Sequence, residues 1–135
     1  MMKRLVTFVA AVLAASSLSA MAGDMITGQY EYMNHCASCH GESGVGDGPI
    51  AGILTVEVPD LTVLANNNDG EFPFLDTLMV IDGRTGVRGH GSNMPVWGDT
   101  FEAEATDKVG IYGAEMVARG RLLSLVEYLV SIQQF

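Results

Sequence analysis

The segment Cys36-Ala37-Ser38-Cys39-His40 constrains this chain more than any other feature, because it uses both cysteines of the protein within five residues. One turn of helix-like backbone would bring the two sulfurs to the same side, where each can form a thioether with a porphyrin vinyl group. His40 would then supply an axial nitrogen to the iron. Cys-x-x-Cys-His is the attachment signature of c-type haem. The motif therefore predicts one covalently bound haem c at Cys36 and Cys39, with His40 as an iron ligand.

Two other uses of Cys-x-x-Cys stay open as alternatives. In redox enzymes of the thioredoxin type, the first thiolate attacks disulfides. Such a site is expected near a βαβ pattern, whereas strands have little support anywhere in this sequence. A structural disulfide would close a very short loop and would stabilise the fold little. We therefore favour haem attachment over a dithiol protein without haem or a structural bridge.

The first 22 residues have the composition of a secretory signal peptide. Lys3 and Arg4 form its positive region, Leu5 to Ala15 carries no charge, and Ala20-Met21-Ala22 offers the small residues of a cleavage site. An uncleaved anchor would need about 20 apolar residues, and serines interrupt this run early. We expect cleavage of residues 1–22 and no stable membrane insertion afterwards. Removing 22 of 135 residues leaves 113, residues 23–135, which suits one mono-haem domain.

The expected mature chain is strongly acidic. All 16 acidic residues lie beyond the signal, whereas two of the seven basic residues leave with it, so the net charge becomes 5 minus 16, or −11. Such a field repels nucleic acid and steers the protein toward basic patches on partners. The same acidity also serves to keep a secreted protein soluble, and charge balance alone does not separate the two roles.

Hydrophobic periodicity predicts a small all-α fold of about four helices, with glycine-rich loops wrapped around the haem. Asp24 is a candidate cap for a first helix that runs through the cysteine motif, and Gly41 to Gly48 is too rich in glycine for a helix. The other expected elements are a short helix at 59–64, a helix from Phe72 or Pro73 to Gly83, an extended segment from Arg84 to Thr100, and a last helix from Ala114 to about Gln133.

The sixth position of the iron has several candidate ligands. Met94 is followed by Pro95 in a loop, where helix packing does not account for it, and it lies far enough beyond His40 to reach the other haem face. His35 directly precedes the motif and is tied to the same side as His40. His90, four residues before Met94, is the rival, and an exogenous ligand is the remaining alternative. We predict Met94 as the second ligand.

With these residues in view, the chain resembles a class I cytochrome c, and in particular the small soluble bacterial periplasmic members of that family. The specific parts of the resemblance are the Cys36–His40 motif and Met94-Pro95-Val96-Trp97-Gly98, and 81–84 and 125–128 add support. In that family the first and last helices cross closely, with a small residue on one and an aromatic residue on the other. Gly28 and Tyr32 against Leu125 and Tyr128 match that arrangement.

The resemblance also implies roles for three other residues. The carbonyl of Pro49 would accept the proton of the proximal imidazole, the indole N–H of Trp97 would donate to a haem propionate, and Arg84 is a further candidate for propionate pairing. Each has a plainer alternative: Pro49 as a loop terminator, Trp97 as a buried ring, and Arg84 as an exposed arginine.

The resemblance implies a periplasmic electron carrier rather than an enzyme, working as a monomer through one His/Met-ligated haem. The chain lacks the lysine ring of the mitochondrial branch, so we expect redox partners with basic docking patches. Two other functions stay open. One is a dedicated cytochrome subunit of a larger dehydrogenase or reductase. The other is a ligand-binding or peroxide-reducing haem protein with a labile sixth ligand.

Overall fold

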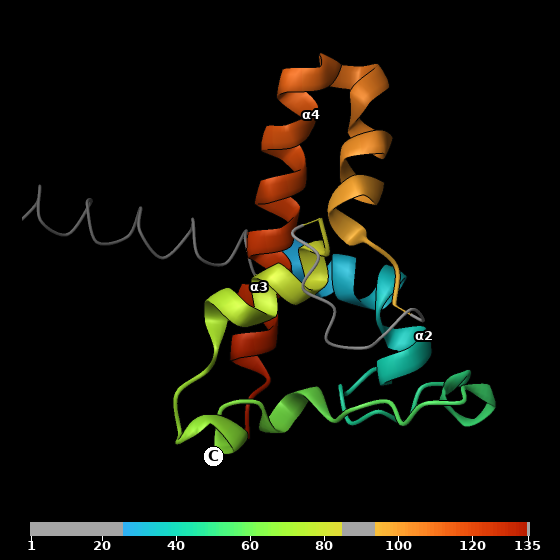
Figure 1. Ribbon diagram of the computed structural model, residues 1–135, viewed down its shortest axis with the longest axis vertical. Coiled ribbons are helices and arrows are strands. Elements are labelled where there is room, and N and C mark those ends of the chain that lie inside the picture. The colour runs from blue at the N-terminus through green and yellow to red at the C-terminus, as the bar shows by residue number, and fades with distance from the viewer. Residues whose placement is uncertain (1–25, 85–93, 135) are drawn as a thin grey trace, which may run out of the picture.

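The computed structural model describes residues 26–84 and 94–134, and the regular elements in these two ranges are all helical (Figure 1). No strand occurs within them. A first helix covers residues 26–35. It is followed by α2 (Ala37–His40), by 3-10 turns at Ala51–Ile53, Leu61–Val63 and Asn66–Asn68, and by α3 (Phe74–Asp82) and α4 (Trp97–Ser131). The predicted all-α fold is confirmed.

Helix α3 begins and ends where the sequence predicted. It follows Pro73, whose ring prevents a continuous helix from entering from the preceding residues. At its other end Gly83 adopts a left-handed conformation, with φ of 69°, and donates its N–H to the carbonyl of Met79 at 3.0 Å. Glycine reaches this conformation without the steric cost that a Cβ imposes, so Gly83 ends the helix.

Helix α4 is a hairpin of two antiparallel arms (Figure 1). The helical path is broken at Gly110, which has φ of 72° and ψ of 171°. The second arm contains the predicted last helix, although helical structure ends at Ser131. The first arm was not predicted, and the expectation of an extended segment as far as Thr100 is wrong because the helix begins at Trp97. Pro95 precedes this arm and Gly98 lies in its first turn, whereas the remaining glycines of the predicted segment lie outside the described residues.

The first helix crosses the second arm of α4 at very short range. A Cβ on Gly28 would collide with the backbone carbonyl of Ser124 and would lie 2.9 Å from Cβ of Tyr128. One turn later the rings of Tyr32 and Tyr128 pack with their centroids 5.2 Å apart. The predicted crossing of the first and last helices is therefore confirmed, and Gly28 is the residue that permits it.

The core forms where this crossing meets α3 and the first arm of α4. Fully buried side chains from the three helices fill it, and α3 contributes Ile81. The largest of the fully buried apolar side chains are Tyr32, Phe101, Leu122, Leu125 and Val126. Within the described ranges, no helix combines the length and apolarity that crossing a bilayer requires. The expected signal peptide, residues 1–22, lies outside the described residues.

Gly28→Ala should test the crossing. We expect a loss of ~1–3 kcal/mol in the free energy of unfolding of the holoprotein, because the added methyl group must displace the Ser124 backbone. Gly120→Ala is the matched control, since a Cβ there meets nothing within 4 Å. The control should be neutral or stabilising by ~0.5–1 kcal/mol, because alanine favours a helix more than glycine does. Equal effects of the two substitutions in urea denaturation would contradict the crossing.

Candidate haem site

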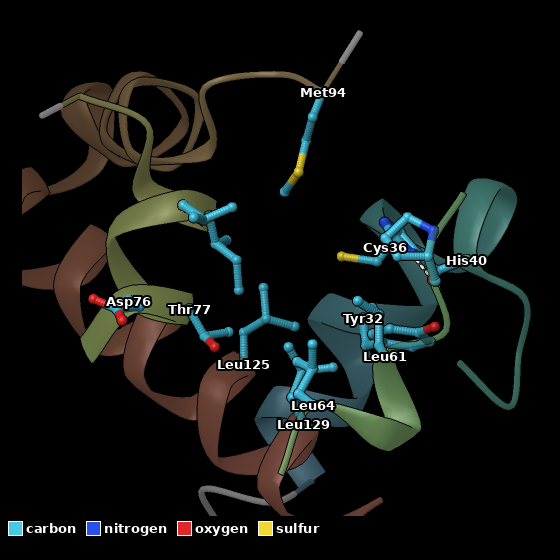
Figure 2. A pocket seen from close by; sticks show the side chains of 13 residues that line it. Tyr32, Cys36, His40, Leu61, Leu64, Asp76, Thr77, Met94, Leu125 and Leu129 are labelled. Carbon is cyan, nitrogen blue, oxygen red and sulfur yellow. Dashed lines mark hydrogen bonds between the residues drawn. The ribbon is translucent and has the colours of Figure 1, made fainter. Parts of the chain in front are cut away.

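A cavity that is partly open to solvent lies between the first helix, α3 and the second arm of α4 (Figure 2). Its lining is mostly apolar and comes from segments that are far apart in the sequence. The lining residues are Tyr32, Cys36, His40, Pro59, Leu61, Leu64, Asp76, Thr77, Val80, Ile81, Met94, Leu125 and Leu129.

The cysteine motif forms a helical turn at one wall of this cavity. The N–H groups of Cys39 and His40 donate to the carbonyl of Cys36 at 3.1 and 2.9 Å. The first helix does not run through the motif as predicted, because its last residue is 35 and α2 begins at 37. The sulfur of Cys36 points into the cavity (Figure 2), whereas Cys39 is half-buried and is not part of the lining.

The environment of Cys36 disfavours the dithiol alternative. Burial, followed by the nearby Cys39 and Glu31, raises the pKa of the Cys36 thiol to about 12. A nucleophilic cysteine needs a lowered pKa, because the thiolate is the reactive form. The first thiol of a disulfide exchanger would therefore be inactive at neutral pH in these surroundings.

His40 lies beside Cys36 and is only 8% exposed. Its Nδ1 is 3.3 Å from the carbonyl oxygen of Pro59. Since a carbonyl can only accept, Nδ1 must carry the proton in this bond, and Nε2 then carries the lone pair with which a neutral imidazole ligates a metal. The geometry thus favours the tautomer that a haem ligand requires.

The prediction that the carbonyl of Pro49 accepts this proton is wrong, because the carbonyl that lies against Nδ1 of His40 is that of Pro59. The glycine-rich loop packs tightly on the motif, with the N–H of Gly46 donating to His40 at 2.8 Å and that of Gly48 donating to Cys39 at 3.1 Å. These bonds hold the loop against the backbone of the motif, and Pro49 lies exposed at the end of the loop. The imidazole ring is instead reached by the later segment that contains Pro59.

Met94 reaches the cavity from a different part of the chain. Its side chain is half-buried and packs against the core, and its thioether points into the cavity from the segment that leads into α4 (Figure 2). This placement fits the predicted sixth ligand, which stays a prediction. The rival His90 lies outside the described residues.

Trp97 and His35 form an aromatic cluster behind the motif. The centroid of the His35 ring is 4.9 Å from that of Trp97 and 5.4 Å from that of Phe101, and His35 Nε2 lies 3.3 Å from a carboxylate oxygen of Glu31. His35 is therefore engaged away from the cavity lining, in line with its rejection as a ligand. The hydrogen bond from Trp97 to a propionate stays a prediction.

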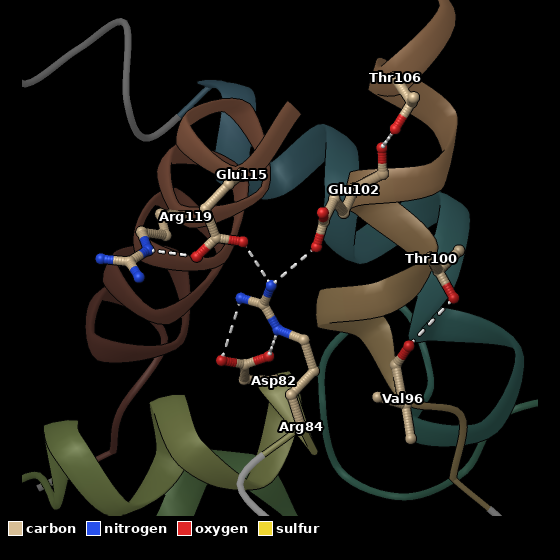
Figure 3. A network of polar contacts seen from close by, with 8 residues as sticks. All are labelled: Asp82, Arg84, Val96, Thr100, Glu102, Thr106, Glu115 and Arg119. Carbon is tan, nitrogen blue, oxygen red and sulfur yellow. Dashed lines mark hydrogen bonds and ion pairs between the residues drawn. The ribbon is translucent and has the colours of Figure 1, made fainter. Parts of the chain in front are cut away.

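Arg84 contacts three carboxylates of the protein (Figure 3). Its Nε is 2.5 Å from Asp82, and its Nη1 lies 3.1 Å from Glu102 and 2.5 Å from Glu115. The hydrogen bond to Asp82 is the main reason that the pKa of Arg84 is raised. The structure thus places this guanidinium in an internal network of carboxylates, and its pairing with a propionate stays a prediction.

The residues present fit a c-type haem. A deep apolar cavity receives a cysteine sulfur and a thioether, and a buried imidazole with the ligating tautomer lies at its wall. Among the described residues, no group of three or more His, Cys, Asp or Glu side chains could hold a bare metal ion. The donor set instead matches a cofactor that brings most of its own iron ligands and binds the protein through apolar contacts.

Sequence reasoning missed several lining residues. Pro59, Leu61 and Leu64 belong to a segment that was expected only as a short helix, and nothing local marks it as part of the site. Leu125 and Leu129 were recognised on the apolar stripe of the last helix, where a cofactor contact and a core contact have the same pattern.

Comparison with known proteins gives one match. Residues 23–112 match the family described as cytochrome c oxidase, cbb3-type, subunit III. A search of curated proteins and a search of solved structures each found nothing that matches the chain. The matched region contains the cysteine motif, α3, Met94 and the first arm of α4.

Proposed function

Because this chain belongs to the cytochrome c oxidase, cbb3-type, subunit III family of c-type cytochromes, which serve haem-based electron transfer, we propose that it is a periplasmic electron carrier with one covalently attached haem c. The observation that carries the proposal is the apolar cavity that holds the Cys36 sulfur, His40 and the Met94 thioether together. Cys36 and Cys39 would form the thioether links, and His40 and Met94 would ligate the iron. Secretion after cleavage of residues 1–22 belongs to the same proposal.

The protein's own part in electron transfer is to hold the site unchanged between two oxidation states. The haem, when bound, supplies the one-electron iron couple. Pro59 orients the imidazole of His40 and raises its basicity through Nδ1. The thioether of Met94 favours the reduced iron, and the apolar lining keeps water from the site. Together these contacts favour a positive reduction potential and a small rearrangement on reduction.

Carrier function is preferred to ligand binding or peroxide reduction because neither histidine of the described ranges is placed to act as an acid or base beside Met94. His40 faces Pro59, and His35 packs on Trp97. Within the described residues, the carboxylate on the lining is that of Asp76, on α3. Slow binding of carbon monoxide to the untreated reduced protein is the result that this preference requires.

Met94→Ala should identify the sixth ligand. We expect the holoprotein to show the spectrum of low-spin covalent haem c, and the variant to lose the far-red thioether-to-iron band and to have a lower reduction potential, within the ~0.8 V range that axial ligands span. Met33→Ala is the matched control, because Met33 is exposed on the first helix. If Met94→Ala keeps both the band and the potential, another residue is the ligand.

If acid acetone extracts the pigment, the haem is not covalently attached.

The surface beside Cys39 indicates the kind of redox partner. The N–H of Ile50 donates to Ser38 at 3.1 Å, so the loop that carries exposed Ile53 and Val56 is fastened to the cysteine motif. No lysine or arginine occurs between Arg4 and Arg84. This loop is therefore an apolar surface within an acidic stretch of chain, and it suits a partner with an apolar centre and a basic rim.

Electron exchange with small reagents should report this charge. Oxidation of the reduced protein by a cationic cobalt complex should slow as salt rises from 10 to 200 mM, and oxidation by an anionic iron cyanide complex should accelerate. An acidic field near the haem predicts that the two oxidation rate constants change in opposite directions, each by at least about three-fold across this range. Stopped-flow rates with the same salt dependence for both reagents would exclude an acidic docking surface.

A second candidate function, a cytochrome subunit of a larger complex, is favoured by the outer end of the α4 hairpin, which projects from the body of the protein (Figure 1). Exposed fractions there are 51% for Val109, 70% for Ile111, 93% for Tyr112 and 70% for Met116. Neighbouring exposed apolar side chains of this kind mark interaction sites more often than free surface.

The elution size of the native protein in a detergent-free periplasmic extract separates the two functions. A free carrier should elute as a monomer of the mature 113 residues, and a double variant, Tyr112→Ser with Met116→Ser, should elute in the same position. For a subunit, the native protein should elute in a larger assembly, and the double variant should leave that assembly while it keeps its haem spectrum.

A further inference from the structure

The chain leaves α3 and enters α4 at one point in space, although Met94 lies between the two helices in sequence. A Cβ on Gly83 would lie 3.3 Å from both methyl carbons of Val96. A Cβ on Gly98 would collide with a carboxylate oxygen of Asp82 and with the guanidinium of Arg84. The end of α3 and the first turn of α4 are therefore in direct contact, and Met94 projects from the segment just before that contact.

Arg84 joins the elements that meet there (Figure 3). Its Nε and Nη2 bind the two carboxylate oxygens of Asp82, at the end of α3, at 2.5 and 3.3 Å. Its Nη1 donates to Glu102 on the first arm of α4 at 3.1 Å and to Glu115 on the second arm at 2.5 Å. A single side chain thus links α3 to both arms of the hairpin.

These bonds belong to the strong class of hydrogen bonds, because every donor and acceptor carries a charge. The side chain of Arg84 is only 22% exposed and that of Asp82 only 19%. Hydrogen bonds from Arg84 and then Arg119 lower the pKa of Glu115, so this carboxylate stays ionised at neutral pH. Removing the guanidinium would leave three carboxylates facing one another, so the contact between α3 and α4 would lose an attraction and gain a repulsion.

We propose that Arg84 is a positioning residue for Met94: it holds the end of α3 against both arms of α4, beside the point where the segment that carries Met94 enters α4, and so keeps the thioether within reach of the iron. The proposal rests on the proposed function, since it requires Met94 to be the axial ligand. Its physical basis is the local concentration of the thioether at the iron, which falls when the two ends of the segment are no longer held together.

The test compares displacement of Met94 by added imidazole in variants of the holoprotein. Arg84→Gln should bind imidazole at least about ten-fold more tightly than the unchanged protein, since the thioether competes less well for the iron once α3 and α4 are no longer joined by charge-assisted hydrogen bonds. The far-red thioether-to-iron band of Arg84→Gln should be weaker in the absence of imidazole. Arg84→Lys keeps the charge but not the planar fork of donors, and should lie between the two.

Two controls separate positioning from general effects. Arg119→Gln also removes a positive charge that is bonded to Glu115, since Arg119 lies 2.6 Å from this carboxylate. Unlike Arg84, Arg119 has a side chain that is 67% exposed and does not contact Asp82. It should change imidazole affinity less than about two-fold. Val126→Ala should lower overall stability without changing imidazole affinity, since Val126 is a fully buried core residue that does not line the cavity. If Arg84→Gln fails to fold, Glu102→Gln, which removes one bond and keeps the arginine, should show the same change in a smaller degree.

The outcomes distinguish the two proposals. If the unchanged protein lacks the far-red band, or if Met94→Ala keeps it, Met94 is not the ligand, and both the ligand assignment and the positioning role are wrong. If the band depends on Met94 but the Arg84 variants bind imidazole as the unchanged protein does, only the positioning role is wrong. An equal effect of Arg84→Gln and Arg119→Gln would likewise overturn it, because net charge would then explain the change.

Discussion

The close crossing of the first helix over the second arm of α4 is the contact on which the remaining structure depends. Because Gly28 has no side chain, the two backbones approach closely at Ser124. Tyr32 then packs on Tyr128 and donates to the carbonyl of Gly41 at 2.7 Å, which holds the end of the cysteine motif. The crossing therefore decides where the haem-binding wall lies relative to the apolar stripe of α4, and the cavity forms between them.

Ion pairs also hold the first helix and the two arms of α4 together. Arg121 binds Glu31 through two parallel bonds of 2.8 Å, contacts Glu104 at 2.6 Å, and lies 3.8 Å above the ring of Phe101. It joins the first helix to both arms of α4, as Arg84 joins α3 to both arms. Burial alone would lower the pKa of Arg121, but the bonds to the two glutamates outweigh burial and raise it. Arg84 and Arg121 are thus bonded to the protein's own carboxylates inside the fold.

The elements with strong local signals were predicted well, and the site was predicted in part. The cysteine motif, the ends of α3 at Pro73 and Gly83, and the apolar face of the last helix all follow from residue types at fixed spacing. Pro49 was misassigned and the carboxylate partners of Arg84 were missed, because both depend on which carbonyl or carboxylate lies nearby. Pro59 reaches His40 across 19 positions of sequence, and Arg84 reaches Glu115 across 31, and no local pattern encodes either distance.

The sequence by itself determined the chemical class of this protein, a c-type cytochrome, because the two cysteines and the histidine of the haem-attachment signature lie within five consecutive residues. It also determined the acidic charge and the all-α class, which depend on composition and periodicity. The tertiary structure decided the carbonyl that orients His40, the arginines that hold the helices together, and the hairpin in α4. These features arise from contacts between distant segments, which exist only after the helices have packed.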